Sequence, residues 1–423
     1  MGICMKKIDD GILKGKKFLF VATVAKTHIC EFHLPYIRYL KSKGAVVDVA
    51  ARYDFDKQDE KELFFNKKED EYAGLNEEKL YKRVAEYMGA SSYTNVSIAR
   101  NPYSPDNIKA FKKLREVISE GNYDIIHCHT PMGALLTRLA AIGSNSKVIY
   151  TAHGLHFYKG APLKNWLAYF PAEFLTAFFT DALITINKED YKTAKRVLFA
   201  KKVLYVRGVG IDTEKFAEDA SPGIKEALRK RLGIPVNAFV CVSVGEFIDR
   251  KNFETAIKAV DIAKNDVADK GKSRKICYYL IGDGANRKEL EALVDSLDLK
   301  RNVKFTGYRR DVALWLLASD VFLFPSIQEG LPVAVMEAMS AELPVICRDI
   351  RGCNELIING SGGFRLKADE MLMPVVFAEK IEHFYDNPED ISEMGAFNQK
   401  WVQKYDIKQV LKKVISIYKS LLK

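Results

Sequence analysis

The sequence lacks paired cysteines. None of its seven cysteines forms a C-x-x-C pair, their number is odd, and they are scattered between Cys4 and Cys353. Several lie in apolar, strand-like runs, such as Cys241 between two valines. We therefore expect reduced, buried thiols that behave as small hydrophobes, as is typical of a cytosolic protein. No low-complexity tract and no repeat of about 20 to 50 residues is visible.

Long apolar runs are missing as well. The most apolar stretch, residues 166–179, is about 14 residues long and contains Pro171 and Glu173. A membrane-spanning helix needs roughly 20 apolar residues, so we expect this stretch not to cross a bilayer. Residues 6–10 mix lysine with aspartate and are followed by no long apolar core, so we expect no secretory signal.

The first half has too few acidic residues to balance its basic ones. Residues 1–208 carry 33 Lys+Arg against 23 Asp+Glu, whereas residues 209–423 carry 32 of each. The whole net charge of +10 therefore lies in the first half. A basic half can face an anionic membrane, a nucleic acid or a phosphorylated substrate, or simply be a soluble surface. Because the charges are dispersed and no nucleic-acid module is recognisable, we expect no nucleic-acid partner.

Short apolar runs alternate with helical segments along both halves of the chain. A length of 423 residues favours two domains. The alternation predicts two α/β units, each a doubly wound, Rossmann-like parallel sheet covered on both faces. The expected strands are 18–22, 46–51, 125–129, 148–151, 183–186 and 203–206 in the first half, and 239–245, 277–281, 303–306, 321–325 and 344–347 in the second.

Glycine-rich chain near residue 208 marks the expected boundary. We predict an N-terminal domain of residues 1–208 and a C-terminal domain of residues 209–397. Residues 398–423 have apolar positions at helical spacing and are expected to form a helix that packs back toward the first domain. Ligands of doubly wound sheets bind outside the carboxyl ends of the strands, so we expect the two domains to face a central cleft.

The strongest chemical signal lies in residues 322–339, where a strand leads through a turn into a helix that begins about Pro332. The free amides at such a helix start favour anions, for example a diphosphate, and Gly330 allows close approach of the backbone. Glu329 can reach a sugar, and Glu337 can accept hydrogen bonds from ribose hydroxyls. The alternative is that a glutamate can occur at any helix start and that Glu337 only faces solvent.

On this motif the sequence resembles the retaining glycosyltransferases of family 4, which have the GT-B fold. The resemblance covers nearly the whole chain and is densest in residues 239–360. It implies that Glu329 contacts the donor sugar and that Glu337 contacts the ribose of the nucleotide. The donor-binding turn would also include Gly330, Leu331, Pro332 and Val333.

A second loop resembles the phosphate-binding loop of this family. It begins at Gly245, and Lys251 matches the lysine of the family pattern. Glu246 stands where the pattern has an arginine, which puts one phosphate contact in doubt. Arg250 could supply the missing charge, although a solvated surface arginine is an equal alternative.

Two further segments resemble donor-side loops of the family. Gly282 lies in a G-x-G turn after a strand, which is weak evidence alone. Tyr308 and Arg309 lie in the segment whose backbone holds the nucleobase in the family. Residues 352–355 resemble another family loop, and helix capping explains them equally well.

Histidines are the notable polar residues of the first half. In the family, a histidine at the place of His153 contacts the donor sugar near the reacting centre, whereas a lone histidine is usually structural. His127 and His129 alternate along a strand, so both point to one side of it. Two such histidines alone are weak evidence for a metal site, and the favoured interpretation is that both have a packing role.

Two loops, residues 26–35 and 153–162, resemble a branch of the family that builds bacterial capsules and exopolysaccharides. In that branch the acceptor is a sugar on a lipid diphosphate, and we assign acceptor contacts to Thr27, His28 and His129. The apolar residues 166–179, flanked by Lys159 and Lys164, could lie at a membrane interface or form an ordinary buried helix.

These features predict a retaining hexosyltransferase that moves a sugar from a UDP-sugar to a lipid-linked or oligosaccharide acceptor in surface polysaccharide synthesis. The C-terminal domain would bind the donor, and the N-terminal domain would bind the acceptor at the inner membrane surface. We expect a cytoplasmic protein with peripheral membrane contact and no metal or other cofactor. The alternatives are a sugar-nucleotide epimerase of the same fold and a sugar-nucleotide-binding protein without turnover.

Overall fold

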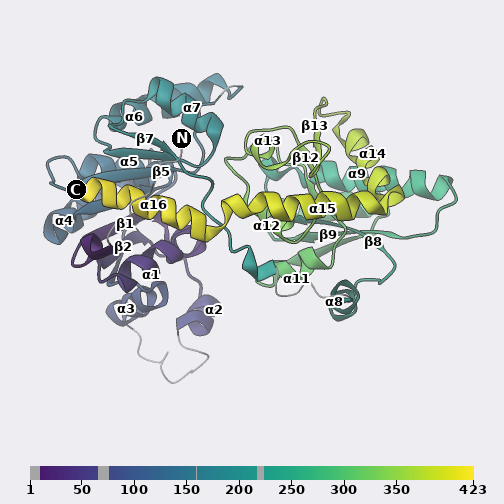
Figure 1. Ribbon diagram of the computed structural model, residues 1–423, viewed down its shortest axis with the longest axis horizontal. Coiled ribbons are helices and arrows are strands. Elements are labelled where there is room, and N and C mark those ends of the chain that lie inside the picture. Colours follow the sequence, from purple (N-terminus) through teal and green to yellow (C-terminus); the bar gives the residue numbers. More distant parts are fainter. Residues whose placement is uncertain (1–9, 65–75, 159, 217–222) are drawn as a thin grey trace. The chain divides into compact units, whose positions relative to one another are not determined.

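The protein is described here by a computed structural model that covers residues 10–64, 76–158, 160–216 and 223–423. The chain forms two compact units, one of Met1–Gly210 with Lys408–Lys423 and one of Ile211–Ile407. Each unit contains one parallel sheet with helices packed against it (Figure 1). The predicted class of two doubly wound, Rossmann-like α/β units is confirmed.

The first unit contains a seven-stranded parallel sheet in the order β3-β2-β1-β4-β5-β6-β7. Phe18 of β1 pairs with Val47 of β2 on one side and with Ile125 of β4 on the other. All five residues of β4 are buried, as expected for a strand covered on both faces. The strands are β1 (Lys17–Val24), β2 (Val46–Arg52), β3 (Ser92–Asn95), β4 (Ile125–His129), β5 (Lys147–Ala152), β6 (Ala182–Thr185) and β7 (Val203–Tyr205).

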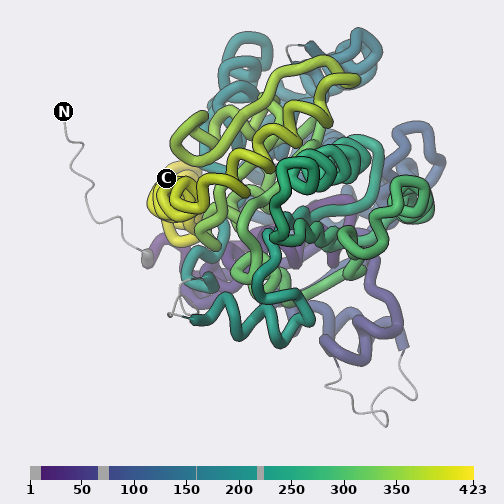
Figure 2. The backbone as a smooth tube through the Cα atoms, turned by 90° about the vertical axis from the view of Figure 1, so that its right-hand side faces the viewer, coloured from purple at the N-terminus to yellow at the C-terminus, as the bar shows by residue number. Residues whose placement is uncertain are grey.

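Helices of the first unit come from both ends of the chain. The last helix, α16, belongs to this unit, and its Tyr418 ring lies 5.4 Å from that of Phe18 in β1. Figure 2 shows this yellow helix from a second side. The helical segments are η1 (Asp10–Leu13), η2 (Ala25–Cys30), α1 (Leu34–Ser42), α2 (Lys57–Asp59), η3 (Glu60–Phe64), α3 (Glu77–Met88), α4 (Asp106–Gly121), α5 (Pro131–Ala140), α6 (Leu163–Ala177), α7 (Lys188–Val197) and α16 (Ile407–Leu422).

The second unit contains a six-stranded parallel sheet in the order β10-β9-β8-β11-β12-β13. The central strands are apolar and buried along their length; β9, for example, reads Ile-Cys-Tyr-Tyr-Leu-Ile with every residue buried. The strands are β8 (Phe239–Val244), β9 (Ile276–Ile281), β10 (Val303–Gly307), β11 (Val321–Phe324), β12 (Val345–Arg348) and β13 (Gly363–Leu366).

Helices of the second unit cover its sheet, with α9 and α14 packed closely together. Apolar residues of α9 such as Ile257 and Val260 join β8, β9 and α14 in one core. The helical segments are η5 (Glu214–Phe216), α8 (Ile224–Leu232), η6 (Asp249–Lys251), α9 (Phe253–Asp269), α10 (Arg287–Ser296), α11 (Val312–Leu317), α12 (Val333–Ser340), α13 (Cys353–Leu356), α14 (Met373–Asp386), α15 (Pro388–Val402) and η7 (Gln403–Tyr405).

The sequence prediction missed the short strands β3 and β13, which close one edge of each sheet. β3 is Ser-Tyr-Thr-Asn with only the tyrosine buried, so it offers no apolar run. The predicted helix of residues 398–423 is not continuous: α15 ends at Val402, and α16 starts at Ile407 after the short turn η7. Asp406, with extended backbone between them, accepts a hydrogen bond from Thr213 at 2.7 Å and so interrupts the helix. From Lys408 on the chain belongs to the first unit, the domain toward which this helix was expected to pack.

Six cysteines fall within the described residues, and all six are free thiols. Five are buried, as predicted, whereas Cys30 is partly exposed. Cys4 lies outside the described residues, as do the lysines of residues 6–7 and Lys159.

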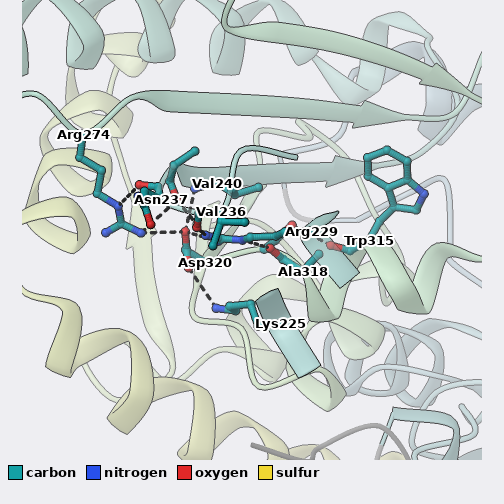
Figure 3. A network of polar contacts seen from close by, with 11 residues as sticks. Lys225, Arg229, Val236, Asn237, Val240, Arg274, Trp315, Ala318 and Asp320 are labelled. Carbon is teal, nitrogen blue, oxygen red and sulfur yellow. Dashed lines mark hydrogen bonds and ion pairs between the residues drawn. The ribbon is translucent and has the colours of Figure 1, made fainter. Parts of the chain in front are cut away.

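The buried carboxylate of Asp320 lies at the edge of the core of the second unit, where β11 begins (Figure 3). It accepts hydrogen bonds from Arg229 at 2.8 Å, from Lys225 at 3.0 Å and from the backbone amide of Val240 at 2.8 Å. Burial by itself raises the pKa of Asp320, but Lys225 and Arg229 bring it below its ordinary value. The carboxylate thus stays charged and ties α8 to β8 and β11.

Replacement of Asp320 with alanine should lower the free energy of unfolding by about 3–5 kcal/mol, because the buried Arg229 would lose its counter-charge. Urea denaturation followed by circular dichroism measures the change. Asp295→Ala is the matched control, since Asp295 pairs with Lys300 where both side chains are more than half exposed. That variant should change stability by less than about 1 kcal/mol. Equal effects of the two substitutions would contradict the assignment.

Candidate functional site

In the second unit, the residues predicted to bind a donor meet where β8 and β11 end. Lys251 lies in η6, shortly after β8, and Glu329 lies in the loop between β11 and α12. The Lys251 Nζ atom donates to Glu329 Oε1 at 2.6 Å, and Arg250 Nη1 donates to the same oxygen at 3.0 Å. The sequence places these side chains 78 positions apart, and the parallel sheet brings them together at its carboxyl edge.

The charge balance of this cluster is positive. One carboxylate, Glu329, faces two cations, Lys251 and Arg250. The side chains of Lys251 and Glu329 are 12% and 10% exposed, whereas that of Arg250 is 44% exposed. Charge-assisted hydrogen bonds of this kind are short and hold the side chains in one geometry. The cluster therefore keeps an excess cation at the sheet edge that can face an anion.

Two residues that the sequence analysis did not single out position this carboxylate. Ser326 donates from Oγ to Glu329 Oε1 at 2.8 Å and contacts the Arg250 carbonyl oxygen at 2.9 Å. Arg351 donates from Nε to the Glu329 carbonyl oxygen at 2.9 Å. Ser326 follows β11 almost directly, so its place after a strand was the available signal, whereas nothing local to Arg351 indicates its role.

Glycines of three neighbouring loops bring their backbones into contact. Gly282, after β9, donates to the Gly307 carbonyl oxygen at 2.9 Å, and the Gly245 amide donates to the Ile281 carbonyl oxygen at 3.0 Å. A Cβ atom on Gly282 would lie only 2.0 Å from the Gly245 carbonyl oxygen, and the φ angle of Gly282 is +139°. Position 282 therefore requires glycine for both space and backbone angle.

The other predicted donor residues lie on the same unit, but their side chains are engaged differently. Tyr308 is exposed after β10, and Arg309 binds the Asp311 carboxylate through two nitrogens at 2.8 and 2.6 Å. Glu337 is half-buried within α12. The expected helix start needs a small correction: Pro332 has extended backbone and caps α12, which begins at Val333.

The loop between β11 and α12 also carries Gly330 and Leu331. Leu331 is buried, so its side chain anchors the loop to the core. Gly330 packs against Gly352, where a Cβ atom would lie 2.6 Å from the Gly330 carbonyl oxygen. Residues 352–355, which follow β12 and resemble a family loop, thus pack against the turn between β11 and α12 through Gly352.

In the first unit, histidines converge at the carboxyl edge of the sheet. His129 ends β4, His153 follows β5, and His28 lies in the π-helix η2 after β1. The ring centroids of His28 and His153 are 4.6 Å apart, and His153 Nε2 lies 3.4 Å from His129 Nδ1. A π-helix is rare and frequently marks a functional site.

Two further histidines, His33 and His127, belong to the same group. The ring of His33 stacks on that of His129 at 3.7 Å, and the rings of His127 and His129 are 4.2 Å apart. His127 and His129 therefore lie on one side of β4, as their alternation implies. His127 bonds the Tyr418 hydroxyl at 2.6 Å through Nδ1 and the Thr151 hydroxyl at 2.7 Å through Nε2, so it has a structural role that ties α16 to the sheet.

Burial keeps these imidazoles neutral. Desolvation lowers the pKa of His127 to about 3 and that of His153 to about 4. The pKa values of the other three are also held well below their ordinary value, first by desolvation and then by neighbouring histidines and, for His28, Arg100. The group therefore presents uncharged ring nitrogens near neutral pH.

Thr27, the remaining predicted acceptor residue, is exposed, and it does not join the histidines. Its hydroxyl donates to Asp54 Oδ2 at 2.9 Å, which ties η2 to the end of β2. His33, His127, His129 and His153 line a small cavity of about 20 Å³. A larger cavity of about 650 Å³ lies at the opposite edge of the sheet, beside Lys16 and Lys147, away from the carboxyl ends where ligands of such sheets bind.

Helix α6 combines the two alternatives considered for residues 166–179. One face packs on the core through Trp166, Phe170 and Phe174. On this side Glu173 is buried and bonded to Arg138 at 2.8 Å. Elsewhere the helix and the turn after it expose large apolar side chains, namely Leu163 (73%), Leu167 (71%), Leu175 (61%) and Phe178 (52%). This exposed set is called the α6 apolar face below.

Comparison with known proteins assigns the chain to a family. Residues 224–401 match the model described as "Glycosyl transferases group 1", and residues 80–187 match "Glycosyl transferase 4-like". EpsD of Bacillus subtilis (strain 168), a protein named as a glycosyltransferase, is 34% identical over 407 residues, which cover 95% of this chain and 96% of EpsD. The chain belongs to the group 1 glycosyltransferases. The resemblance seen in the sequence is therefore confirmed.

One further relative and one solved structure are similar to this chain. An Escherichia coli protein named UDP-Gal:alpha-D-GlcNAc-diphosphoundecaprenol alpha-1,3-galactosyltransferase is 31% identical over 282 residues, which cover 65% of this chain and 70% of that protein. The crystal structure of HepE from Anabaena, in complex with UDP and glucose, has a TM-score of 0.73 at 17% identity and covers 96% of this chain and all of HepE. The likeness to HepE shows the GT-B type of fold.

Within the described residues, no helix of this glycosyltransferase is both long and apolar enough to span a membrane. This agrees with the expectation for residues 166–179, which cover most of the 15-residue α6 (Leu163–Ala177) and the turn that follows it.

The substitution Gly282→Ala should destabilise the second unit by about 3 kcal/mol, because the new Cβ atom collides with the Gly245 carbonyl oxygen in addition to the strain at positive φ. Gly271→Ala is the matched control: its φ is +70°, but nothing lies within 4 Å of the added Cβ. It should cost only about 1–2 kcal/mol. Urea midpoints of the two variants measure the difference, and a control as unstable as Gly282→Ala would refute the proposed steric contact.

Proposed function

We propose that this glycosyltransferase moves a hexosyl unit from a UDP-sugar to a lipid-diphosphate-linked sugar, with retention at the anomeric carbon. The observation that carries the proposal is the cluster of Lys251, Arg250 and Glu329, which joins a cationic loop to the first of the two glutamates, Glu329 and Glu337, on which the family resemblance rests. The UDP bound to HepE and the UDP-galactose and diphosphoundecaprenol named for the Escherichia coli relative support this substrate class.

In this proposal the second unit binds the donor. Lys251 and Arg250 face the diphosphate, together with the free amides at the start of α12. Arg250 thereby replaces the charge missing at Glu246, and its position beside Lys251 on one carboxylate oxygen supports that role. Glu329 binds the sugar, and Glu337 binds the ribose.

Donor binding would change the partners of the cluster. Lys251 and Arg250 now share one carboxylate oxygen, Glu329 Oε1. A diphosphate would offer both cations a second anion and release part of the carboxylate for the sugar hydroxyls. The backbone of Tyr308 and Arg309 would hold the base, because the Arg309 guanidinium is already bound to Asp311.

The reaction itself needs charge stabilisation at the leaving group. The bond between the anomeric carbon and the UDP oxygen breaks, and the acceptor hydroxyl attacks from the same face. Its proton passes to the departing phosphate oxygen. Preorganised cations aimed at such a developing charge often contribute several kcal/mol. The proposal assigns this to Lys251, Arg250 and the helix amides, without a metal ion.

The first unit would bind the acceptor and complete the reaction site. His153 would contact the donor sugar, and His28, His129 and Thr27 would contact the acceptor. The half-buried His153 and the exposed Thr27 are reachable from solvent, which supports these contacts. His28 and His129 are buried, so contact with an acceptor requires local opening of η2.

We also propose that the α6 apolar face rests on the cytoplasmic membrane surface. Exposed leucines and phenylalanines of this face can enter the lipid headgroup region, and the exposed Lys164 beside them can bind anionic lipids. The net charge of the first half, +10, acts in the same direction. Such contact would bring the protein to an acceptor that is itself held in the membrane.

Substitution of Lys251 with alanine should lower the rate of UDP release by about 100-fold or more, because one preorganised cation at the leaving phosphate is typically worth that much. Glu329→Gln should also impair sugar transfer. Arg250→Ala tests the compensation for Glu246 and should cost less, since this side chain is more exposed. The exposed Lys258, paired with Glu254, provides the control Lys258→Ala, with wild-type activity expected.

The assay screens UDP-sugars with and without membrane lipid extract. Release that depends on the extract supports transfer to a lipid-linked acceptor. A changed sugar released without acceptor would instead indicate an epimerase, and donor binding without UDP release would indicate a binding protein. Full activity of both Lys251→Ala and Glu329→Gln would refute the assignment of these residues to the donor site.

The double substitution Leu163→Ser and Leu167→Ser should reduce binding to vesicles that contain anionic lipid by at least about tenfold, because each leucine loses part of the roughly 1.5–3 kcal/mol of its burial. Co-sedimentation with vesicles measures the change. Ile108→Ser in α4 is the matched control, since Ile108 is an equally exposed apolar residue of the same unit, 63% exposed. Binding that is unaltered by the double substitution would refute this surface.

A further inference from the structure

Four histidines of the first unit present their ring nitrogens to a common point. One nitrogen from each of His28, His33, His129 and His153 lies within 4.8 Å of the others. They come from η2, the turn before α1, the end of β4 and the residue after β5, so the fold rather than the local sequence assembles them. Four of the seven histidines of the chain therefore meet in one place, and a fifth lies beside them.

Three of these four histidines have buried ring nitrogens without a hydrogen-bond partner, whereas His153 Nε2 contacts His129 Nδ1 at 3.4 Å. Both nitrogens of His33, and the Nε2 atoms of His28 and His129, are buried without a partner. A polar atom buried without a partner destabilises the fold, and an unfilled ligand site is one explanation for it. A native core rarely carries four of these atoms together without a reason.

The neighbouring His127 shows what a purely structural histidine looks like in this fold. Both of its nitrogens are bonded, one to the Tyr418 hydroxyl and one to the Thr151 hydroxyl. The chain therefore supplies partners for a buried imidazole where packing alone is its role. This difference separates His127 from His28, His33 and His129, each of which has at least one buried ring nitrogen without a partner.

The type of ligand selects the type of ion. A set made only of imidazole nitrogens suits zinc, nickel, cobalt or copper, whereas magnesium and calcium require oxygen ligands. Tetrahedral zinc with bonds of about 2.0–2.1 Å holds its ligand atoms about 3.3 Å apart, and His129 Nδ1 and His153 Nε2 already lie 3.4 Å apart. The cavity of about 20 Å³ beside them has room for one ion.

We propose that His28, His33, His129 and His153 form a binding site for one divalent transition-metal ion of the zinc type. The neutral state of these histidines leaves the lone pairs available. The rings of His33 and His129 stack, so their lone pairs run nearly parallel, and binding requires the His33 ring to turn about its side-chain bonds. The half-buried His153 leaves a route for entry.

The site goes beyond the proposed function and does not depend on it. An ion at this site would occupy His153, assigned to the donor sugar, and His28 and His129, assigned to the acceptor. The loaded and unloaded proteins would therefore differ in how they bind both substrates. Binding can be measured without sugar transfer. A protein that binds one ion but transfers no sugar would refute the proposed function and leave this proposal intact.

Isothermal titration of tag-free, chelator-stripped protein with Zn²⁺ should show one site per chain. His33→Phe keeps a flat ring and should weaken binding by more than about 100-fold, since even outer-shell partners of a metal site are worth roughly 10–100-fold. His383→Gln is the matched control, because His383 bonds Asp390 in the second unit and should leave binding unaltered. Wild-type protein that binds no Zn²⁺ saturably, or that binds it no better than His33→Phe, would overturn the proposal.

X-ray absorption of the zinc-loaded wild-type protein needs no variant. It therefore tests the proposed histidine ligands even if His33→Phe does not fold. Four nitrogen ligands at about 2.0–2.1 Å would support the site. A sulfur ligand near about 2.3 Å would place the ion on cysteine and overturn it.

Discussion

Parallel strands that are covered on both faces must be apolar along their length, and this constraint decides where polar chemistry can occur in the protein. Strands such as β9 and β11 are apolar and buried at every position. The chemistry-bearing side chains therefore gather where the strands end. In the second unit the loops after β8 and β11 join Lys251 to Glu329, and in the first unit the ends of β4 and β5 bring His129 to His153. The same physical rule produces a cationic cluster in one unit and an uncharged one in the other.

Most of the fold could be predicted because buried parallel strands are contiguous apolar runs, which the sequence displays directly. The edge strand β3 could not be predicted from an apolar run, since only Tyr93 of its four residues is buried. The break before α16 could not be predicted because it depends on a hydrogen bond that Asp406 accepts from Thr213, a residue almost two hundred positions away in the sequence. Helix α6 was ambiguous for a physical reason: the burial of Glu173 against Arg138 gives it one core face, while its leucines remain exposed.

The candidate sites could be predicted in part. Glutamates and glycines that directly follow a strand form a local pattern that resembles the family loops. Glu329, Lys251 and Gly282 could therefore be chosen as donor-binding candidates from the local sequence. Ser326 and Arg351, which hold Glu329, have no such pattern. His127 and His129 were named as a pair on one strand, and His28 and His153 were named singly, but their convergence is tertiary. No spacing in the sequence shows that His33 lies on His129.

The chain leaves the first unit at Gly210 and returns to it at Lys408. The returning helix supplies Tyr418, which packs on Phe18 and bonds His127. During synthesis, therefore, the N-terminal residues emerge from the ribosome long before the helix that completes their core. The second unit, continuous from Ile211 to Ile407, has all of its strands available earlier. The part of the protein made first is thus the part finished last, and its open core must be kept from other chains until the last turn of α16 is released.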